Sequence, residues 1–324
     1  MNFKKIKAIL FTSILTFCAC GCTSEKSSSD TLSIAYQYGI AYAPIIICQD
    51  QNLINKYYEE TTGNQVSITW NQMSSGADIN TGIASGSLNV GFLGIAPALN
   101  GISSNLGYKI FSNISGQPHA LMTNDSTINS LGDIISGNKQ IALVNTGSIQ
   151  HIILAKSLYD NGYDPHILDS YIVSMKHPDG MNSLLSGSIS CHLTTVPYVN
   201  MEKNSSSLHE IIEVSSSWSA DNSFVVGVAS TQIYEDNPQL YNALCNAIAY
   251  SIDFINNNPE EAAKITCKYT GNTFEDELEY ILTGNYTVKT SGILELSSFM
   301  TKNGFMNNEI ATYNDIVFDN VTGD

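Results

Sequence analysis

The sequence predicts an α/β protein built from two similar lobes and a helical C-terminal region. Three observations indicate this. Short apolar runs alternate with helical patterns from residue 32 onward, one strand-and-helix unit occurs twice, and the last third of the chain becomes helical. Alternation of strands with helices is typical of sheets with crossover connections. About three hundred residues remain after the N-terminal segment, which is enough for two hydrophobic cores.

The N-terminal segment, residues 1–21, is predicted to be an export signal. Three lysines precede an apolar run that is too short to span a bilayer. The run ends in "CACGC", which resembles the lipidation site of bacterial lipoproteins, and we expect Cys22 to be the modified residue because Gly21 precedes it, with Cys20 as the alternative. Residues 22–31 then read as a flexible tether. We therefore expect a lipid-anchored protein on the extracytoplasmic face of a bacterial cell membrane.

The charge balance excludes several classes of partner. The formal net charge is −16, and cleavage before Cys22 removes three lysines and no acidic residue, which brings it to −19. Such a chain is not expected to bind nucleic acid or to adhere electrostatically to anionic lipid. Every basic residue is a lysine, so no bidentate arginine can hold an anion. Backbone N–H groups, hydroxyls, amides or a lysine such as Lys109 or Lys176 must do so.

The cysteines beyond the signal are not expected to form a metal site. They are widely separated and lack close ligand pairs, which argues against zinc. Cys48 and Cys191 lie in apolar runs and are predicted to be buried thiols, whereas a disulfide stays an open alternative for an exported protein. No other metal or cofactor is expected.

The first strands and helices follow each other closely. "LSIAY" precedes a helix that begins near Pro44, "QVSITW" precedes "GADINTGIASG", and "LNVGFLG" precedes "APALNGISS". Each apolar run has the length of a buried strand, and each following segment repeats its apolar residues at helical spacing. The pattern predicts successive strand–helix units.

A polar elbow interrupts residues 140–162. The apolar run 141–144 predicts a strand, and the spacing of isoleucines and leucines from Ile149 predicts a helix that stops at Gly162. Thr146 or Ser148 can cap this helix, and Gly147 lets the backbone approach closely. The first-turn N–H groups lack intrahelical partners, so the elbow either caps an ordinary helix or binds an acceptor-rich ligand.

Two stretches of the chain resemble each other. Residues 74–97 and 177–197 both contain a polar turn, a short helix, Ser-Gly-Ser, a strand and a loop that ends in proline. The agreement in order and register predicts that the same unit occurs once in each lobe. From residue 231 onward, apolar residues at helical spacing between Leu240 and Ile255 predict one long helix, which Pro259 separates from the next.

The succession of these motifs resembles a known family. The stretches "YQYGIAYAPIIICQDQNLINKY", "SSGADINTGIASGSLNVGFLGIAPAL", "NTGSIQHIILAKSLYDNGYD" and "HPDGMNSLLSGSISCHLTTVP" are similar to signatures of substrate-binding proteins of ABC importers in the nitrate/sulfonate/taurine group, which includes binders of thiamine precursors. The resemblance implies a periplasmic-binding-protein-like fold with two crossings between lobes, expected at residues 118–126 and 222–230. Residues 32–120 would begin lobe 1, residues 121–226 would form lobe 2, and residues 227–324 would return to lobe 1.

The resemblance also implies where the ligand lies. The turns at residues 37–42, 74–78 and 145–151 would face a cleft between the lobes, with helix starts that supply N–H donors. Three tyrosines would offer aromatic faces, and three histidines would donate hydrogen bonds, although each of these residues could serve packing alone. The expected ligand-binding residues are Tyr36, Gln37, Tyr38, Tyr42, Ser75, Gly76, Gly94, His119, Thr146, Gly147, Ser148, His151, His177 and Pro197.

The implied function is capture of a small organic solute and delivery to the transmembrane subunits of an ABC permease by a monomeric lipoprotein that is not an enzyme. The solute would be an anion such as a sulfonate, nitrate or taurine, or a heteroaromatic compound such as a thiamine precursor. One alternative is an enzyme resembling a eukaryotic pyrimidine synthase of the same fold, but the "CCCFC" stretch of that enzyme has no counterpart beyond the signal. Another alternative is a sensory lipoprotein without a transport role.

Overall fold

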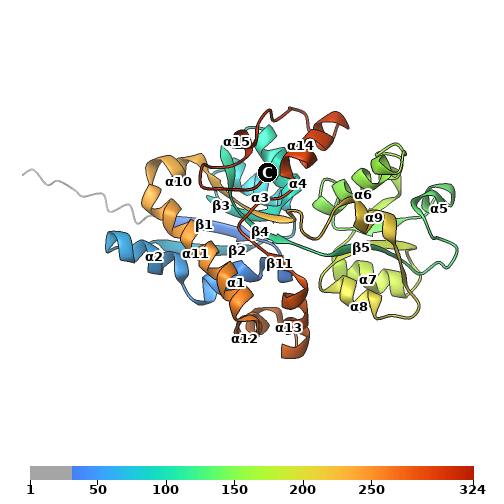
Figure 1. Ribbon diagram of the computed structural model, residues 1–324, viewed down its shortest axis with the longest axis horizontal. Helices are drawn as coiled ribbons and strands as arrows, with labels where there is room; N and C mark the ends of the chain where they lie inside the picture. Colours follow the sequence, from blue (N-terminus) through green and yellow to red (C-terminus); the bar gives the residue numbers. More distant parts are fainter. Residues whose placement is uncertain (1–30) are drawn as a thin grey trace, which may run out of the picture.

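The chain folds around two separate β-sheets (Figure 1). The computed structural model describes residues 31–324. The predicted export signal, the lipidation at Cys22 or Cys20, and the tether up to residue 30 lie outside the described residues. The expected α/β class with two lobes is confirmed, and each lobe contains one sheet with its helices.

The sheet of the first lobe has six strands in the order β11-β4-β10-β3-β1-β2. The strands β1, β2 and β3 are parallel, and β10 and β11 run antiparallel to β4. Their bounds are β1 Thr31–Tyr36, β2 Ser67–Gln72, β3 Val90–Gly94, β4 Tyr108–Gly116, β10 Val225–Ser230 and β11 Asn285–Tyr286. The β3 residues are all buried, which explains the continuous apolar run in the sequence.

Helices cover both faces of this sheet. The connection from β1 to β2 and the connection from β2 to β3 run in opposite directions along the sheet, so the right-handed crossover rule puts their helices on opposite faces. The helices of this lobe are η1 Ile40–Tyr42, α1 Ala43–Asp50, α2 Leu53–Thr62, α3 Gly76–Ala84, α4 Ile95–Ser103, α10 Thr231–Asp236, α11 Pro238–Asn257, α12 Pro259–Thr270, α13 Phe274–Thr283, α14 Ile293–Lys302 and α15 Tyr313–Ile316. The long helix α11 and the break before Pro259 confirm the sequence-based expectation.

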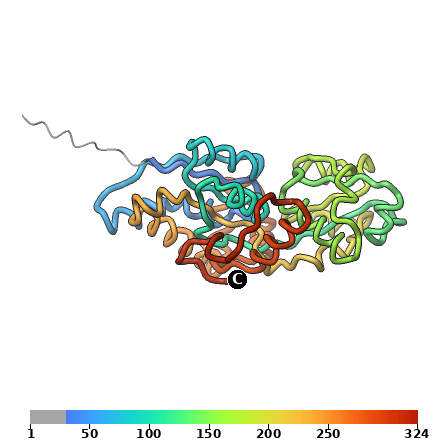
Figure 2. Tube along the Cα trace, turned by 90° about the horizontal axis from the view of Figure 1, so that it is seen from above, coloured from blue at the N-terminus to red at the C-terminus, as the bar shows by residue number. Residues whose placement is uncertain are grey.

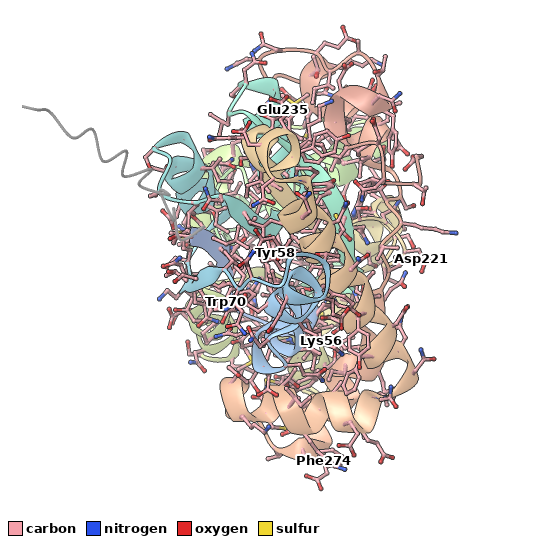
Figure 3. All side chains as sticks on the ribbon, turned by 90° about the vertical axis from the view of Figure 1, so that its left-hand side faces the viewer. Lys56, Tyr58, Trp70, Asp221, Glu235 and Phe274 are labelled. Atoms are coloured by element: carbon pink, nitrogen blue, oxygen red, sulfur yellow. The ribbon has the colours of Figure 1, made fainter. Side chains whose placement is uncertain are left out.

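The far end of the first lobe is formed by α2 and α11 (Figure 3). Lys56 of α2 lies 5.7 Å from the ring centroid of Tyr250 of α11, a cation–π distance. This end lies opposite the second lobe (Figure 1). It therefore closes the core of the first lobe rather than contributing to contacts between lobes.

The sheet of the second lobe has five strands in the order β7-β6-β8-β5-β9. The bounds are β5 His119–Thr123, β6 Ile141–Leu143, β7 Ile172–Ser174, β8 Cys191–Thr195 and β9 His209–Ile211. Its helices are α5 Leu131–Ser136, α6 Ile149–Asp160, η2 Asp169–Tyr171, α7 His177–Leu185, α8 Tyr198–Lys203 and α9 Ile212–Ser217. The parallel trio β7-β6-β8 repeats the arrangement of β2-β1-β3, with an antiparallel strand next to each trio.

The two predicted copies of the strand-and-helix unit fold alike. In the first copy α3 leads through Gly86 into β3, and in the second copy α7 leads through Gly187 into β8. Both glycines have positive φ, 73° and 75°, a conformation that favours glycine. The flanking serines form the same side-chain hydrogen bond, at 3.0 Å in the first copy and 2.9 Å in the second. The sequence similarity thus reflects one repeated structural unit.

Two short segments connect the lobes (Figure 2). Residues 117–118 lead from β4 to β5, and residues 218–224 lead from α9 back to β10. The expected crossings at residues 118–126 and 222–230 are placed too late, because most of those extended residues are the strands β5 and β10 themselves. Trp218 lies in the second crossing and is buried.

The described residues contain four free cysteines, and Cys48 and Cys191 are buried as predicted. Within residues 31–324, no group of three or more histidine, cysteine or acidic side chains is arranged to hold a metal ion. None of the helices in this range is both long enough and apolar enough to cross a membrane.

Candidate functional site

A cavity of about 420 Å³ lies between the two lobes. Turns that follow the parallel strands β1 and β2 of the first sheet and β6 and β7 of the second contribute to its wall. Ligands in α/β proteins commonly bind at the carboxyl ends of parallel strands. The lining residues are Gln37, Tyr38, Gly39, Ala41, Tyr42, Ser74, Gly76, Ala77, Asn80, Gly94, Pro97, Asn100, Val144, Asn145, Thr146, Gly147, Ser148, Ile149, Gln150, Lys176, His177, Pro178, Thr195, Val196, Tyr198 and Phe224.

The turn after β1 supplies aromatic and amide groups. The Tyr42 hydroxyl donates a hydrogen bond to Gln37 Oε1 at 3.0 Å, which holds both side chains in the cavity wall. Burial raises the pKa of Tyr42 strongly, so its hydroxyl stays protonated and able to donate. Tyr38 lies beside them and remains 63% exposed. This ring can therefore cover a solute without being fixed in the core.

The elbow before α6 faces the cavity from the second lobe. Ser148 caps the helix, because its Oγ accepts a hydrogen bond from the His151 backbone N–H at 3.3 Å. Gly147 has a φ of 80° and donates its N–H to His151 Nδ1 at 3.0 Å. The backbone N–H groups of Ile149 and Gln150 lie in the first turn, where no intrahelical acceptor is available. The elbow thus turns helix N–H donors toward the space between the lobes.

Two further helices begin at the cavity. Ser75 caps α3, accepting from the Asp78 N–H at 3.2 Å, and Lys176 precedes α7. Gly76 must be small, since a Cβ there would lie 2.6 Å from the Pro97 side chain. Helix N-termini carry partial positive charge. Among the lining residues, Lys176 carries a formal charge and no aspartate or glutamate is present. The wall is therefore electropositive, although the protein as a whole is acidic.

Aromatic rings border the cavity on the side of the second lobe. The His177 ring stacks on Tyr198, with centroids 5.6 Å apart and an interplanar angle of 28°. Phe224, from the returning crossing, stacks on His119 at 6.2 Å. Tyr198 and Phe224 were not among the expected site residues, although the proline-ended loop of the second repeat pointed to the position just before Tyr198. Nothing in the local sequence distinguishes Phe224 from a core residue.

A row of hydrogen-bonded polar side chains leads from the cavity wall into the second lobe. Gln150 Nε2 lies 3.2 Å from His177 Nε2, and His177 Nδ1 lies 3.2 Å from His192 Nε2. His192 Nδ1 lies 2.6 Å from Glu202 Oε1. Desolvation by burial lowers the pKa of His177 to about 3 and that of His192 to about 4, and burial raises the pKa of Glu202. Both histidines are therefore neutral near pH 7.

The cavity contains many of the expected residues, namely Gln37, Tyr38, Tyr42, Gly76, Gly94, Thr146, Gly147, Ser148 and His177. Expected residues outside its lining are Tyr36, Ser75, His119, His151 and Pro197. The Tyr36 hydroxyl donates to Gln49 Oε1 at 3.3 Å, and Ser75 is occupied as a helix cap. Pro197 lies between two lining residues and accepts from the Asn200 N–H at 3.1 Å.

The two expected histidines outside the lining have structural surroundings. His151 accepts from Gly147 through Nδ1 and lies 3.0 Å from Asp169 Oδ1 through Nε2, so both ring nitrogens are used. His119 is buried behind Phe224, and desolvation lowers its pKa to about 4. Of the two lysines expected near the cleft, Lys176 lines the cavity and Lys109 donates to the Asn314 carbonyl instead.

Comparison with family models gives one match in this chain. The model described as "NMT1/THI5 like" matches residues 64–262, which include the whole second lobe and the turns of α3 and α4 in the first. No curated protein matches the chain.

Solved structures with a similar fold include sulfonate-binding proteins. The periplasmic aliphatic sulphonate binding protein SsuA of Escherichia coli has 13% identity and a TM-score of 0.67, with 90% of this chain and 93% of that chain covered. The alkanesulfonate-binding protein SsuA of Xanthomonas axonopodis pv. citri, bound to MOPS, has 12% identity and a TM-score of 0.68, with 91% and 98% covered. A Candida albicans protein with the generic periplasmic binding protein fold has 13% identity and a TM-score of 0.65, with 88% and 93% covered. The expected fold is thereby confirmed.

Proposed function

The chain belongs to the NMT1/THI5-like family, and from this premise we propose that it is an extracytoplasmic solute-binding lipoprotein that delivers a small organic solute to an ABC permease. The observation that carries the proposal is the cavity between two lobes joined by only two short crossings. Such clefts can close by hinge motion, which lets both lobes contact one solute.

The proposed activity is binding without chemical conversion. A volume of about 420 Å³ suits a small organic molecule. Helix starts, amide side chains and aromatic rings surround it, which are groups that orient a ligand. In this proposal the site residues bind and orient the solute without reacting with it. The rate of lobe opening then determines how fast the solute is released for transport.

The proposed solutes fall into two classes. Helix N-termini and Lys176 favour an acceptor-rich group such as the oxyanion of a sulfonate, nitrate or a taurine-like compound. The rings of Tyr38 and Tyr198 favour a heteroaromatic solute similar to a thiamine precursor. Two of the structural neighbours are sulfonate-binding proteins, which supports the first class as a starting point.

The site residues follow from the same proposal. We assign solute contact to Gln37, Tyr38, Tyr42, Thr146 to Ser148 and His177, and a supporting role to the expected residues outside the lining. The proposal also includes a lipid anchor at Cys22 or Cys20, transmembrane permease subunits as partners, and a monomeric state.

A ligand screen on residues 24–324 tests the function. Thermal unfolding is measured against sulfonates, nitrate, taurine, thiamine precursors, flavins and nucleobases. A ligand at about a hundred times its dissociation constant stabilises the folded state by roughly 2.7 kcal/mol, so the true solute class gives a clear rise in melting temperature.

The control is a sample unfolded, washed and refolded to remove any carried-over ligand. A saturable shift in this sample, reproduced by calorimetric titration with one site per chain, is the expected result. If no compound of any class raised the melting temperature of the refolded sample, this result would contradict the proposal for these solutes.

A further inference from the structure

His192 and Glu202 are buried in the second lobe outside the cavity lining, and hydrogen bonds connect them to it through His177. Resting on the proposed function, we propose that these two side chains are positioning residues, which hold the Gln150 amide with its nitrogen toward His177 and its oxygen toward the solute. The solute would then carry an N–H or O–H donor that meets Gln150 Oε1. This donor adds to the acceptor-rich group that the helix N-termini recognise.

The direction of each hydrogen bond follows from the chemistry of the groups. An amide nitrogen can only donate, so His177 Nε2 must accept from Gln150 Nε2. A neutral imidazole has one N–H, so the proton of His177 lies on Nδ1 and is donated to His192 Nε2. His192 in turn has its proton on Nδ1, and this group donates to Glu202 Oε1. With the amide nitrogen toward His177, each donor of the row points away from the cavity and Glu202 Oε1 accepts the last hydrogen bond.

Packing keeps the row in place. The side chains of His192 and Glu202 are both 0% exposed. A Cβ added at Gly180 would lie 2.6 Å from His192 Nε2, so the glycine makes room for the ring. Glu202 Oε2 is buried and has no hydrogen-bond partner among the described residues. Glu202 Oε1 can accept from His192 whether Oε2 carries a proton or not, which agrees with the raised pKa of this carboxyl group.

The row ends at Gln150, which belongs to the cavity lining. Gln150 lines the cavity, and its Oε1 takes no hydrogen bond within the described part of the chain. A solute without a donor at this place would leave the amide oxygen unsatisfied once the lobes close and exclude water. Sites built to hydrogen-bond a donor discriminate strongly against analogues that lack it.

The first test is independent of any solute. NMR of residues 24–324 labelled with ¹⁵N histidine, at pH 7.5, reports which ring nitrogen of each histidine carries the proton; His177→Gln and His192→Gln assign the signals. We expect Nδ1–H for both His177 and His192. The opposite tautomer, Nε2–H on both, would mean that the amide is reversed and presents its nitrogen to the cavity, and it would overturn the proposal.

The second test uses matched probes and variants. 2-Aminopyrimidine is compared with 2-methoxypyrimidine, and 2-aminoethanesulfonate with propanesulfonate, by NMR titration. The member of each pair that carries the donor should bind at least about tenfold more tightly in any pair that binds. Glu202→Leu removes the terminal acceptor and should reduce this ratio toward one and mix the tautomers, whereas Glu202→Gln retains an acceptor oxygen and should preserve both readouts.

The outcomes separate this inference from the proposed function. A ratio near one in the wild type, binding of neither pair, or an unchanged ratio in Glu202→Leu would overturn the inference while a hit in the thermal screen still supports solute binding. If Glu202→Leu does not fold, the inference is tested on the wild-type protein alone, by its histidine tautomers and by the ratio of its affinities for the matched probes. A purely structural role for Glu202 would change stability but not the ratio between matched probes.

Discussion

At the scale of single residues, the burial of His119 predicts that the protein loses stability as the pH falls. The pKa of His119 is lowered from 6.5 to about 4, chiefly by desolvation, so the folded state stays neutral where the unfolded chain takes up a proton. The contribution to stability is complete above pH 6.5 and is lost as the pH falls toward 4. A difference of this size corresponds to about 3 kcal/mol at most. Denaturant unfolding at pH 7 and pH 4 measures it.

The control for His119 is a side chain of similar size that does not titrate. His119→Gln should lose stability at neutral pH, but its free energy of unfolding should fall less between pH 7 and pH 4 than that of the wild type. The ion pair between Lys203 and Glu210, 2.7 Å apart, lies near this histidine and is retained in both proteins. Identical pH slopes would show that His119 titrates normally in the folded state.

Tyr38 is expected to contribute to binding of the solute but little to stability. Tyr38 lines the cavity and is 63% exposed, so Tyr38→Ala should leave the melting temperature nearly unchanged and weaken binding of the solute about tenfold. Tyr269 is 45% exposed and does not line the cavity, and Tyr269→Ala serves as the matched control without effect on affinity. Equal affinities of the Tyr38 variant and the wild type would remove Tyr38 from the site.

Only part of the site could be predicted from patterns of neighbouring residues in the sequence. Ser148 and Gly147 could be predicted because capping and close backbone approach depend on neighbouring residues. His151 could not be assigned, since Asp169, its partner, lies 18 positions away and is brought near by the fold. The row from Gln150 to Glu202 joins four residues from different elements, and no spacing in the sequence signals it.

At the scale of elements, the repeated unit gives a matched pair of substitutions. Gly86 and Gly187 both have positive φ and open space where a Cβ would lie, so strain of the backbone alone determines the cost of alanine. Gly86→Ala and Gly187→Ala should each destabilise the protein by about 1 kcal/mol. Urea unfolding measures both. The corresponding asparagine variants should cost less, because asparagine adopts this conformation more readily. Clearly unequal costs would show that the turns are not equivalent.

The elements themselves were largely predictable. The runs that became β2, β3 and β6 have a strand period or a buried apolar composition, and α11 has a clear apolar face. The crossings were displaced because β5 and β10 are themselves extended, and an extended sequence pattern does not distinguish a strand within a sheet from a segment that connects two sheets.

At the scale of the whole molecule, the order of the lobes along the chain was predicted from the family resemblance. The match of the family model confirms that resemblance, and the structural neighbours confirm the fold. What no sequence pattern showed is how the lobes touch. Beside the cavity, a Cβ at Gly94 of the first lobe would lie 3.2 Å from Ile149 of the second, so the cleft is narrow in this structure.

A second set of contacts bridges the lobes at α14, which packs against α4 of the first lobe and contacts α6 of the second through the Phe299 and Tyr159 rings, with centroids 5.7 Å apart. The turn after α14 is held on the first lobe by hydrogen bonds between Asn308 and Ser103. In the same turn the Phe305 ring stacks on His166 of the second lobe, 4.3 Å between centroids. His166 also lies 2.7 Å from the Asn303 carbonyl through Nε2.

These contacts join the two lobes, so opening of the proposed cleft would break them, and we expect them to stabilise a closed form. Phe305→Ala should shift the population toward an open form, raise the dissociation constant of the solute about tenfold and speed its release, because opening no longer separates stacked rings. Small-angle scattering of the unliganded protein should give a larger radius of gyration. Stopped-flow dissociation measures the release rate.

The matched control is Phe254→Ala, which removes a partly buried ring that stacks on Tyr250 within α11, away from the second lobe. It should lower stability by a comparable amount without changing release. If both variants released the solute at the wild-type rate, the contacts at α14 would be incidental to closure. If only the Phe305 variant is faster, the turn after α14 controls how long the solute stays bound, since it joins the two lobes.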